Sequence, residues 1–133
     1  MKILIIHGPN MNLFGLRNKK DQYAITLDKI NSHIRKYIRN KNIQIQILQT
    51  HNEAKAVSYI QKNRKKISGL ILSPCMWDNN GFILNELLDL IKLKYVIINI
   101  EKDINNKLFK SGEMIYNKNI LLSFEKALEY FYE

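Results

Sequence analysis

Short apolar runs that alternate with amphipathic segments constrain the fold of this chain more than any other feature. Residues 3–6, 69–72 and 95–100 are nearly uninterrupted apolar runs, which predict strands buried on both faces. Residues 43–47 alternate apolar and polar side chains and predict a strand with one buried face. A short fifth strand is expected near residues 114–116.

Between these runs, apolar residues recur at helical spacing. Helices are predicted over residues 26–41, 53–65 and 82–92, and a last helix is expected to be capped by Ser123. Thr26 suits an N-cap, and Asp28 suits the positive end of a helix dipole. Alternating strands and helices favour a parallel sheet between two helical layers. Right-handed crossovers then favour an α/β, flavodoxin-like, doubly wound sheet of five strands in the order 2-1-3-4-5.

The length and composition limit the class of protein. The 133 residues fit one domain, 1–133, with enough chain for a hydrophobic core. No apolar run reaches the roughly 18 residues of a membrane span. The start of the chain is too short and too polar for a secretory signal, so we expect a cytoplasmic protein. The single cysteine, Cys75, excludes an intrachain disulfide and is expected to be buried and inert.

The formal net charge of +9 would ordinarily suggest nucleic acid or another anion as a partner. Most of the basic residues are lysines spread along the chain, and isoleucine and asparagine, which share A/T-rich codons with lysine, are also abundant. Codon bias therefore explains much of the charge. Clustered basic residues interleaved with aromatic ones are absent, so a basic nucleic-acid-binding domain ranks third among the functions considered.

Polar residues after the first buried strand are candidates for a site, because loops at the carboxyl ends of parallel strands bind ligands. Pro9 stops the strand, since it has no amide hydrogen for the sheet. Asn10, Asn12 and Arg17 follow. A strand followed by a capped turn explains the two asparagines equally well. Residues 17–23 and 101–112 lack periodicity and are expected to be mobile loops over the strand ends.

Residues 7–17 read His-Gly-Pro-Asn-x-Asn-Leu-x-Gly-x-Arg. This string resembles the N-terminal signature of the type II 3-dehydroquinate dehydratases, and the rest of the chain is similar to that family in element order and spacing. Many signature residues are changed, as in a divergent member. The resemblance implies dehydration of 3-dehydroquinate to 3-dehydroshikimate in the shikimate pathway, through an enolate and with no metal, Schiff base or other cofactor. It also implies a homo-oligomer, in which trimers pack into a dodecamer.

This chemistry needs a base, a stabiliser of the enolate oxygen and a proton donor for the departing water. The resemblance implies that Arg17 is the essential loop arginine and that Asn10 orients a water near the enolate. The family's base is a tyrosine, whose position is occupied here by Gln22, with Tyr23 next to it. Either the loop shifts by one residue and presents Tyr23 as the base, or Tyr23 packs on the rim of the site.

The third and fourth strands are followed by changed residues. Ser73 and Asn79 replace the asparagine and the histidine of the family's Asn-Pro-Gly-Ala-x-x-His, and Glu86 replaces an aspartate. Lys110 replaces an arginine that binds the carboxylate and lacks its bidentate fork. The resemblance implies substrate binding by these four residues and by the backbone of Ile100 and Glu101, with support from Asn12, Gln49 and Glu53.

The fourth strand departs most from the family, which reads Glu-x-His where residues 97–99 read Ile-Ile-Asn. Asn99 stands at the position of the proton-donating histidine and cannot titrate, although it could orient a water. Asn106 stands where the family has a second arginine. His51 and Lys107 are each one residue away from a missing family residue and are candidates to compensate.

These changes predict a slow hydro-lyase, because loss of a general acid costs about 10²–10⁴-fold in rate. The alternative is a degenerate member that keeps the fold and the oligomer but binds its ligand without turnover. A phospho-receiver domain shares this topology but fits less well, because it needs acidic residues directly after the first strand and none is there. A dinucleotide site is excluded because Gly-x-Gly-x-x-Gly is absent.

Overall fold

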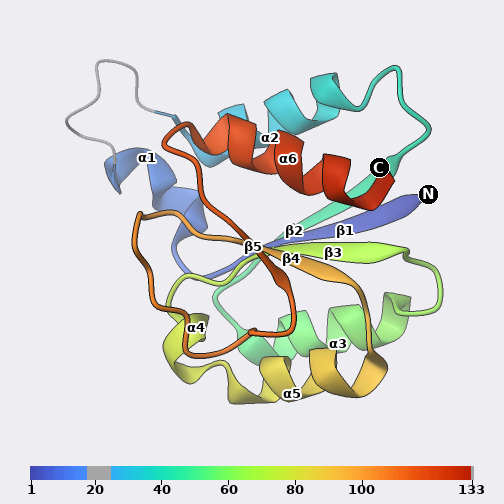
Figure 1. The fold of residues 1–133 in the computed structure, drawn as a ribbon, viewed down its shortest axis with the longest axis vertical. Helices are drawn as coiled ribbons and strands as arrows, with labels where there is room; N and C mark the ends of the chain where they lie inside the picture. Colours follow the sequence, from blue (N-terminus) through green and yellow to red (C-terminus); the bar gives the residue numbers. More distant parts are fainter. Residues whose placement is uncertain (18–24, 133) are drawn as a thin grey trace.

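Five parallel strands form one sheet in the order β2-β1-β3-β4-β5 (Figure 1). The computed structural model describes residues 1–17 and 25–132. The strands are β1 (Lys2–His7), β2 (Gln44–Gln49), β3 (Gly69–Ser73), β4 (Tyr95–Ile98) and β5 (Glu113–Ile115). The predicted doubly wound, flavodoxin-like sheet and its strand order are confirmed.

Helices cover both faces of the sheet. Figure 1 shows α2 and α6 on one face and α3 and α5 on the other. The helices are η1 (Met11–Leu13), α1 (Phe14–Arg17), α2 (Leu27–Tyr37), α3 (Glu53–Asn63), α4 (Trp77–Asn80), α5 (Phe82–Ile91) and α6 (Ile120–Tyr132). Among the described residues, none of these helices combines the length and the apolar character needed to cross a membrane.

The central strands supply both layers of the core. Ile3 and Ile5 pack with the residues of α2 and α6, whereas Leu4 and Ile6 pack with those of α3 and α5. Successive side chains of a strand point to opposite faces, so an uninterrupted apolar run fills both layers. The two-sided burial predicted for β1 and β3 is confirmed. The sequence predicted a fourth strand that ends at residue 100, whereas β4 ends at Ile98.

The edge strand β2 differs from its prediction. Its alternating sequence predicted one buried face, but all residues from Ile45 to Gln49 are half-buried. Among the strands of the described residues, β2 pairs only with β1, so no described strand lies along its outer side. Ile45 and Ile47 pack on the α2–α6 layer, whereas Leu48 packs on the α3–α5 layer.

Two helix starts show how local hydrogen bonds decide a boundary. Thr26 caps α2 as predicted, because its Oγ1 accepts a hydrogen bond from Lys29 N at 3.2 Å. The prediction that Ser123 caps the last helix is wrong. The Asn119 side chain accepts from Leu121 N at 3.0 Å, and α6 begins at Ile120, so Ser123 is buried inside the helix.

The ends of β1 and β3 approach each other closely at Gly8. Its backbone N–H donates to Ser73 O at 2.9 Å. A Cβ atom at this position would lie 2.6 Å from Ser73 O and 2.8 Å from Pro74 O. Gly8 therefore allows the two strand ends to meet where their polar connections begin.

We expect Gly8→Ala to lower the free energy of unfolding by about 1–3 kcal/mol, because the new methyl group meets backbone atoms that cannot move aside. Urea denaturation measures the change. The control is Gly15→Ala in α1, where the added Cβ would meet the Thr26 side chain at 3.2 Å. That variant should change stability by less than about 1 kcal/mol. Equal effects of the two substitutions would contradict the close approach.

Candidate functional site

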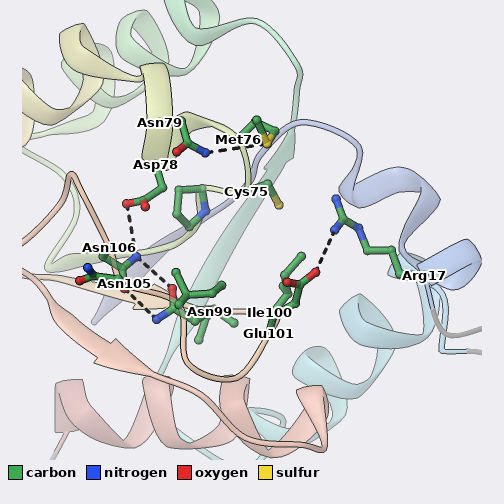
Figure 2. Close-up of a pocket in the computed structure, with 13 residues that line it drawn as sticks. Arg17, Cys75, Met76, Asp78, Asn79, Asn99, Ile100, Glu101, Asn105 and Asn106 are labelled. Atoms are coloured by element: carbon green, nitrogen blue, oxygen red, sulfur yellow. Dashed lines mark hydrogen bonds and ion pairs between the residues drawn. The ribbon is translucent and has the colours of Figure 1, made fainter.

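A pocket of about 260 Å³ lies beyond the carboxyl ends of β3 and β4 (Figure 2). Its walls come from the end of α1, from the segment between β3 and α5, and from the connection between β4 and β5. Its lining residues are Arg17, Pro74, Cys75, Met76, Asp78, Asn79, Ile98, Asn99, Ile100, Glu101, Ile104, Asn105 and Asn106. This is the edge of a parallel sheet at which ligands bind in open α/β folds.

Two of the three charged residues that line the pocket face each other on one side of it. Arg17, the last residue of α1, points its guanidinium toward Glu101, and Arg17 Nη1 lies 3.9 Å from Glu101 Oε1 (Figure 2). Both side chains are exposed, so this ion pair contributes little stability. Arg17 is therefore available to an anionic ligand, although the carboxylate of Glu101 offsets part of its charge.

The β4 side of the pocket is built from amides. Asn99 Nδ2 donates to Asn106 Oδ1 at 3.0 Å, and Asn106 Nδ2 donates to Asn99 Oδ1 at 3.1 Å (Figure 2). Asn79 and Asn105 also line the pocket. Amides donate and accept hydrogen bonds without charge, so this side can bind hydroxyl and carbonyl groups but cannot exchange a proton by titration.

The buried carboxylate of Asp78 ties the β4–β5 connection to α4. Its Oδ1 accepts from Asn106 Nδ2 at 3.3 Å and from Leu108 N at 3.2 Å. Its Oδ2 accepts from Lys107 N at 3.1 Å. A second anchor follows, because Asn85 Oδ1 in α5 accepts from Phe109 N at 2.8 Å. Residues 106–109 are therefore held against the two helices, within the loop that was expected to be mobile.

Cys75 forms part of the pocket floor. It adopts the left-handed backbone conformation, with φ of 53°, at the position where the family motif has a glycine. Burial raises the pKa of its thiol to about 11, while Arg17 lowers this pKa and Glu101 raises it. The thiol is therefore protonated at neutral pH and is a poor nucleophile.

The polar residues after β1 form a separate, hydrogen-bonded turn. Asn10 has φ of 66°, and its backbone N–H donates to His51 Nδ1 at 3.0 Å. Gln49 Nε2 donates to Gly8 O at 3.2 Å. Residues at the end of β2 therefore support the turn that begins after β1.

The structure brings five of the residues selected from the sequence together in the pocket: Arg17, Asn79, Asn99, Ile100 and Glu101. The others do not line it. Asn10, Asn12, Glu86 and Lys110 are exposed, Ser73 is buried in β3, and Gln49 supports the turn after β1. Glu53 Oε2 accepts from Leu84 N at 3.0 Å and joins α3 to α5.

The candidate base Tyr23 and its neighbour Gln22 lie outside the described residues. The two candidates to compensate are placed away from the pocket lining. His51 accepts from Asn10 N, and Lys107 donates its backbone N–H to Asp78. The roles predicted for all these residues remain predictions.

Sequence reasoning missed Asp78. It occupies one of the two unspecified positions of the family motif, and its partners lie 28 to 30 residues further along the chain. No local pattern signals such contacts. Within residues 1–17 and 25–132, no three His, Cys, Asp or Glu side chains gather in a way that could hold a metal ion.

Comparisons with known proteins agree with the resemblance of the opening motif. The family model for dehydroquinase class II matches residues 1–121. The 3-dehydroquinate dehydratase of Halothermothrix orenii is 31% identical over 99 residues, covering 74% of this chain and 67% of that protein. The one from Geotalea daltonii is 27% identical over 115 residues, covering 86% of this chain and 80% of that protein.

Among solved structures, the type II dehydroquinase of Butyrivibrio crossotus has the same fold. It superposes with a TM-score of 0.85 at 21% sequence identity, and the match covers 100% of this chain and 98% of that one.

The raised pKa of Cys75 predicts slow alkylation. At pH 8, a pKa of about 11 leaves about one thiol in a thousand ionised. Iodoacetamide should therefore react roughly a hundredfold more slowly with the folded protein than with the urea-unfolded chain. Arg17→Ala should slow the reaction further, and Glu101→Gln should speed it, because the two charges act on the thiolate in opposite directions. Alkylation of the folded protein at the unfolded rate would contradict this placement of Cys75.

Proposed function

The chain belongs to the class II dehydroquinase family, and we propose that it dehydrates 3-dehydroquinate slowly to 3-dehydroshikimate in the pocket beyond β3 and β4. The observation that carries the proposal is the convergence of Arg17, Asn79 and Asn99 on one pocket at the carboxyl ends of these strands. The matching relatives are named 3-dehydroquinate dehydratase.

The polar groups of the pocket suit this substrate, which combines a carboxylate, ring hydroxyls and a ketone. The amides of Asn79 and Asn99 can donate to and accept from the hydroxyls. We assign the carboxylate to the backbone N–H groups of Ile100 and Glu101. The volume of about 260 Å³ suits a small metabolite.

Proton removal is assigned to Tyr23. A free tyrosine has a pKa of about 10, so ionising it at neutral pH costs roughly 4 kcal/mol, which a nearby cation must offset. Arg17 is the arginine of the pocket lining and is the group assigned to this task. Glu101, whose Oε1 lies 3.9 Å from Arg17 Nη1, weakens its effect. The base is therefore less strongly activated than an unopposed arginine would make it.

Loss of the hydroxyl needs a proton, and the residues that face this step cannot supply one by titration. Asn99 and Asn106 hydrogen-bond to each other and carry no acidic proton. Asn99 can orient a water molecule, which donates a proton to the departing hydroxyl and takes up in exchange the proton that Tyr23 removed from the substrate. Because a missing general acid costs about 10²–10⁴-fold in rate, the proposed enzyme is slow.

A second candidate is a family member that binds dehydroquinate without turning it over. The observation in its favour is the pair of amides at the positions that the family fills with a histidine and an arginine. Fixed amides preserve binding to hydroxyl groups, whereas they remove acid catalysis.

We also propose that the chain forms the homo-oligomer of its family, trimers packed into a dodecamer. Exposed apolar side chains on α5 support this assembly. Phe82, Ile83 and Leu90 expose 64%, 65% and 71% of their surface, and large apolar side chains left exposed on one helix suit a contact between subunits.

We expect the purified protein to produce the enone 3-dehydroshikimate slowly from 3-dehydroquinate, as followed by ultraviolet absorbance. Arg17→Ala and Tyr23→Phe should each remove most of this activity, because they eliminate the cation and the base. Arg35→Ala is the matched control, because Arg35 lies exposed in the last turn of α2 and its loss changes the net charge equally. It should leave the rate within about twofold, as for a surface change away from the site.

The outcomes separate the two candidates. Binding of dehydroquinate in calorimetry without turnover favours the second candidate. Tyr23→Phe with wild-type activity would show that the base is another group. Neither binding nor turnover would overturn both functions.

A further inference from the structure

We propose that Asp78 is a positioning residue, which acts through Asn106 to fix the donor and acceptor directions of the Asn99 amide in the pocket. The effect on a ligand rests on the function proposed above, because it assumes that dehydroquinate contacts Asn99. The effect on Asn99 itself does not depend on that assumption.

The Asp78 carboxylate accepts every hydrogen bond that it makes with the β4–β5 connection. An ionised carboxylate only accepts hydrogen bonds, and three donors converge on this one: the amides of Lys107 and Leu108 and the Asn106 side chain. The two backbone donors hold the connection against the carboxylate whichever way the Asn106 amide points. The side chain of Asn106 is the variable partner.

The carboxylate fixes the orientation of the Asn106 amide. Asn106 Nδ2 has two hydrogens, of which one points to Asp78 Oδ1 and the other to Asn99 Oδ1. Its Oδ1 then faces Asn99 Nδ2. Turning the Asn106 amide over would place its oxygen against the carboxylate, which is repulsive because neither group could donate.

The orientation of the Asn106 amide fixes that of the Asn99 amide. Its nitrogen faces the oxygen of Asn106, and its oxygen faces the nitrogen. One N–H and one lone pair of the Asn99 side chain remain for other partners. Their directions are determined by Asp78 through Asn106. A ligand hydroxyl can adapt to either direction, whereas a carbonyl or carboxylate oxygen only accepts. Asp78 therefore influences which ligand groups Asn99 can bind.

The test uses the full-length chain with isotope-labelled asparagine side chains. Asp78→Asn preserves the size of the side chain but sets its amide nitrogen against a donor in either orientation, Lys107 N in one and Leu108 N with Asn106 Nδ2 in the other, so residue 78 no longer selects one orientation of the Asn106 amide. In nuclear magnetic resonance spectra, the side-chain amide hydrogens of Asn99 should then exchange with water at least tenfold faster than in the wild type.

Asp89→Asn is the matched control. Asp89 Oδ1 accepts from Ser111 Oγ at 2.9 Å, so it also contacts the β4–β5 connection, but it lies outside the pocket lining. Its substitution should leave the Asn99 signals and dehydroquinate binding unchanged.

A ligand measurement adds a second readout. The affinity for dehydroquinate in calorimetry should fall about three- to tenfold in Asp78→Asn, the effect of weakening one hydrogen bond. In an Asn106→Ala background the same substitution should change affinity less than twofold, because the side chain that connects Asp78 to Asn99 is gone. A general loss of structure would not depend on Asn106 in this way.

Unchanged exchange of the Asn99 amide in Asp78→Asn would overturn the proposal, as would an equal effect in the Asn106→Ala background. If Asp78→Asn fails to fold, the test uses Asn106→Ala alone, which should accelerate exchange of the Asn99 amide hydrogens. Unchanged exchange in that variant would also overturn the proposal. Absence of dehydroquinate binding by the wild type would refute the proposed function, while the exchange measurement would still decide the role of Asp78.

Discussion

Burial of the central strands on both faces is the constraint on which the rest of this structure depends. β1, β3 and β4 give their side chains to two apolar layers, so polar groups are concentrated where the strands end. His7 shows what happens to a titratable side chain that is buried in one of these strands. It is buried at the end of β1, its Nε2 pairs with Asn31 Oδ1 at 2.9 Å, and burial lowers its pKa to about 4, so the ring stays neutral.

The same constraint places the pocket. The connections after β3 and β4 leave the sheet at one edge, and the second connection donates hydrogen bonds to side chains of α4 and α5, which hold it against these helices. The resulting pocket has one arginine, an opposing glutamate and a group of amides. This composition is suited to binding a hydroxylated carboxylate, and it limits proton transfer because amides do not titrate at the positions of Asn99 and Asn106.

The sequence predicts the sheet well because apolar runs report burial directly. Arg17 follows the first buried strand, whereas Asn79 and Asn99 were selected through the family resemblance; all three line the pocket, and their roles remain predictions. It predicts less where the outcome depends on competition between neighbours or on distant partners. Ser123 is a residue type that caps helices, but the Asn119 side chain provides the cap at the start of α6. Asp78 carries no local signal, because its role comes from the folding of residues 106–108 onto α4.

The proposed function depends on the binding of dehydroquinate in the pocket beyond β3 and β4. A crystal structure of the protein soaked with 3-dehydroquinate tests it most directly. We expect ligand density between Arg17 and Asn99, with the carboxylate on the backbone N–H groups of Ile100 and Glu101 and ring hydroxyls on the amides of Asn79 and Asn99. Density at another site, with this pocket empty at a ligand concentration that saturates the protein in solution, would contradict the proposed function.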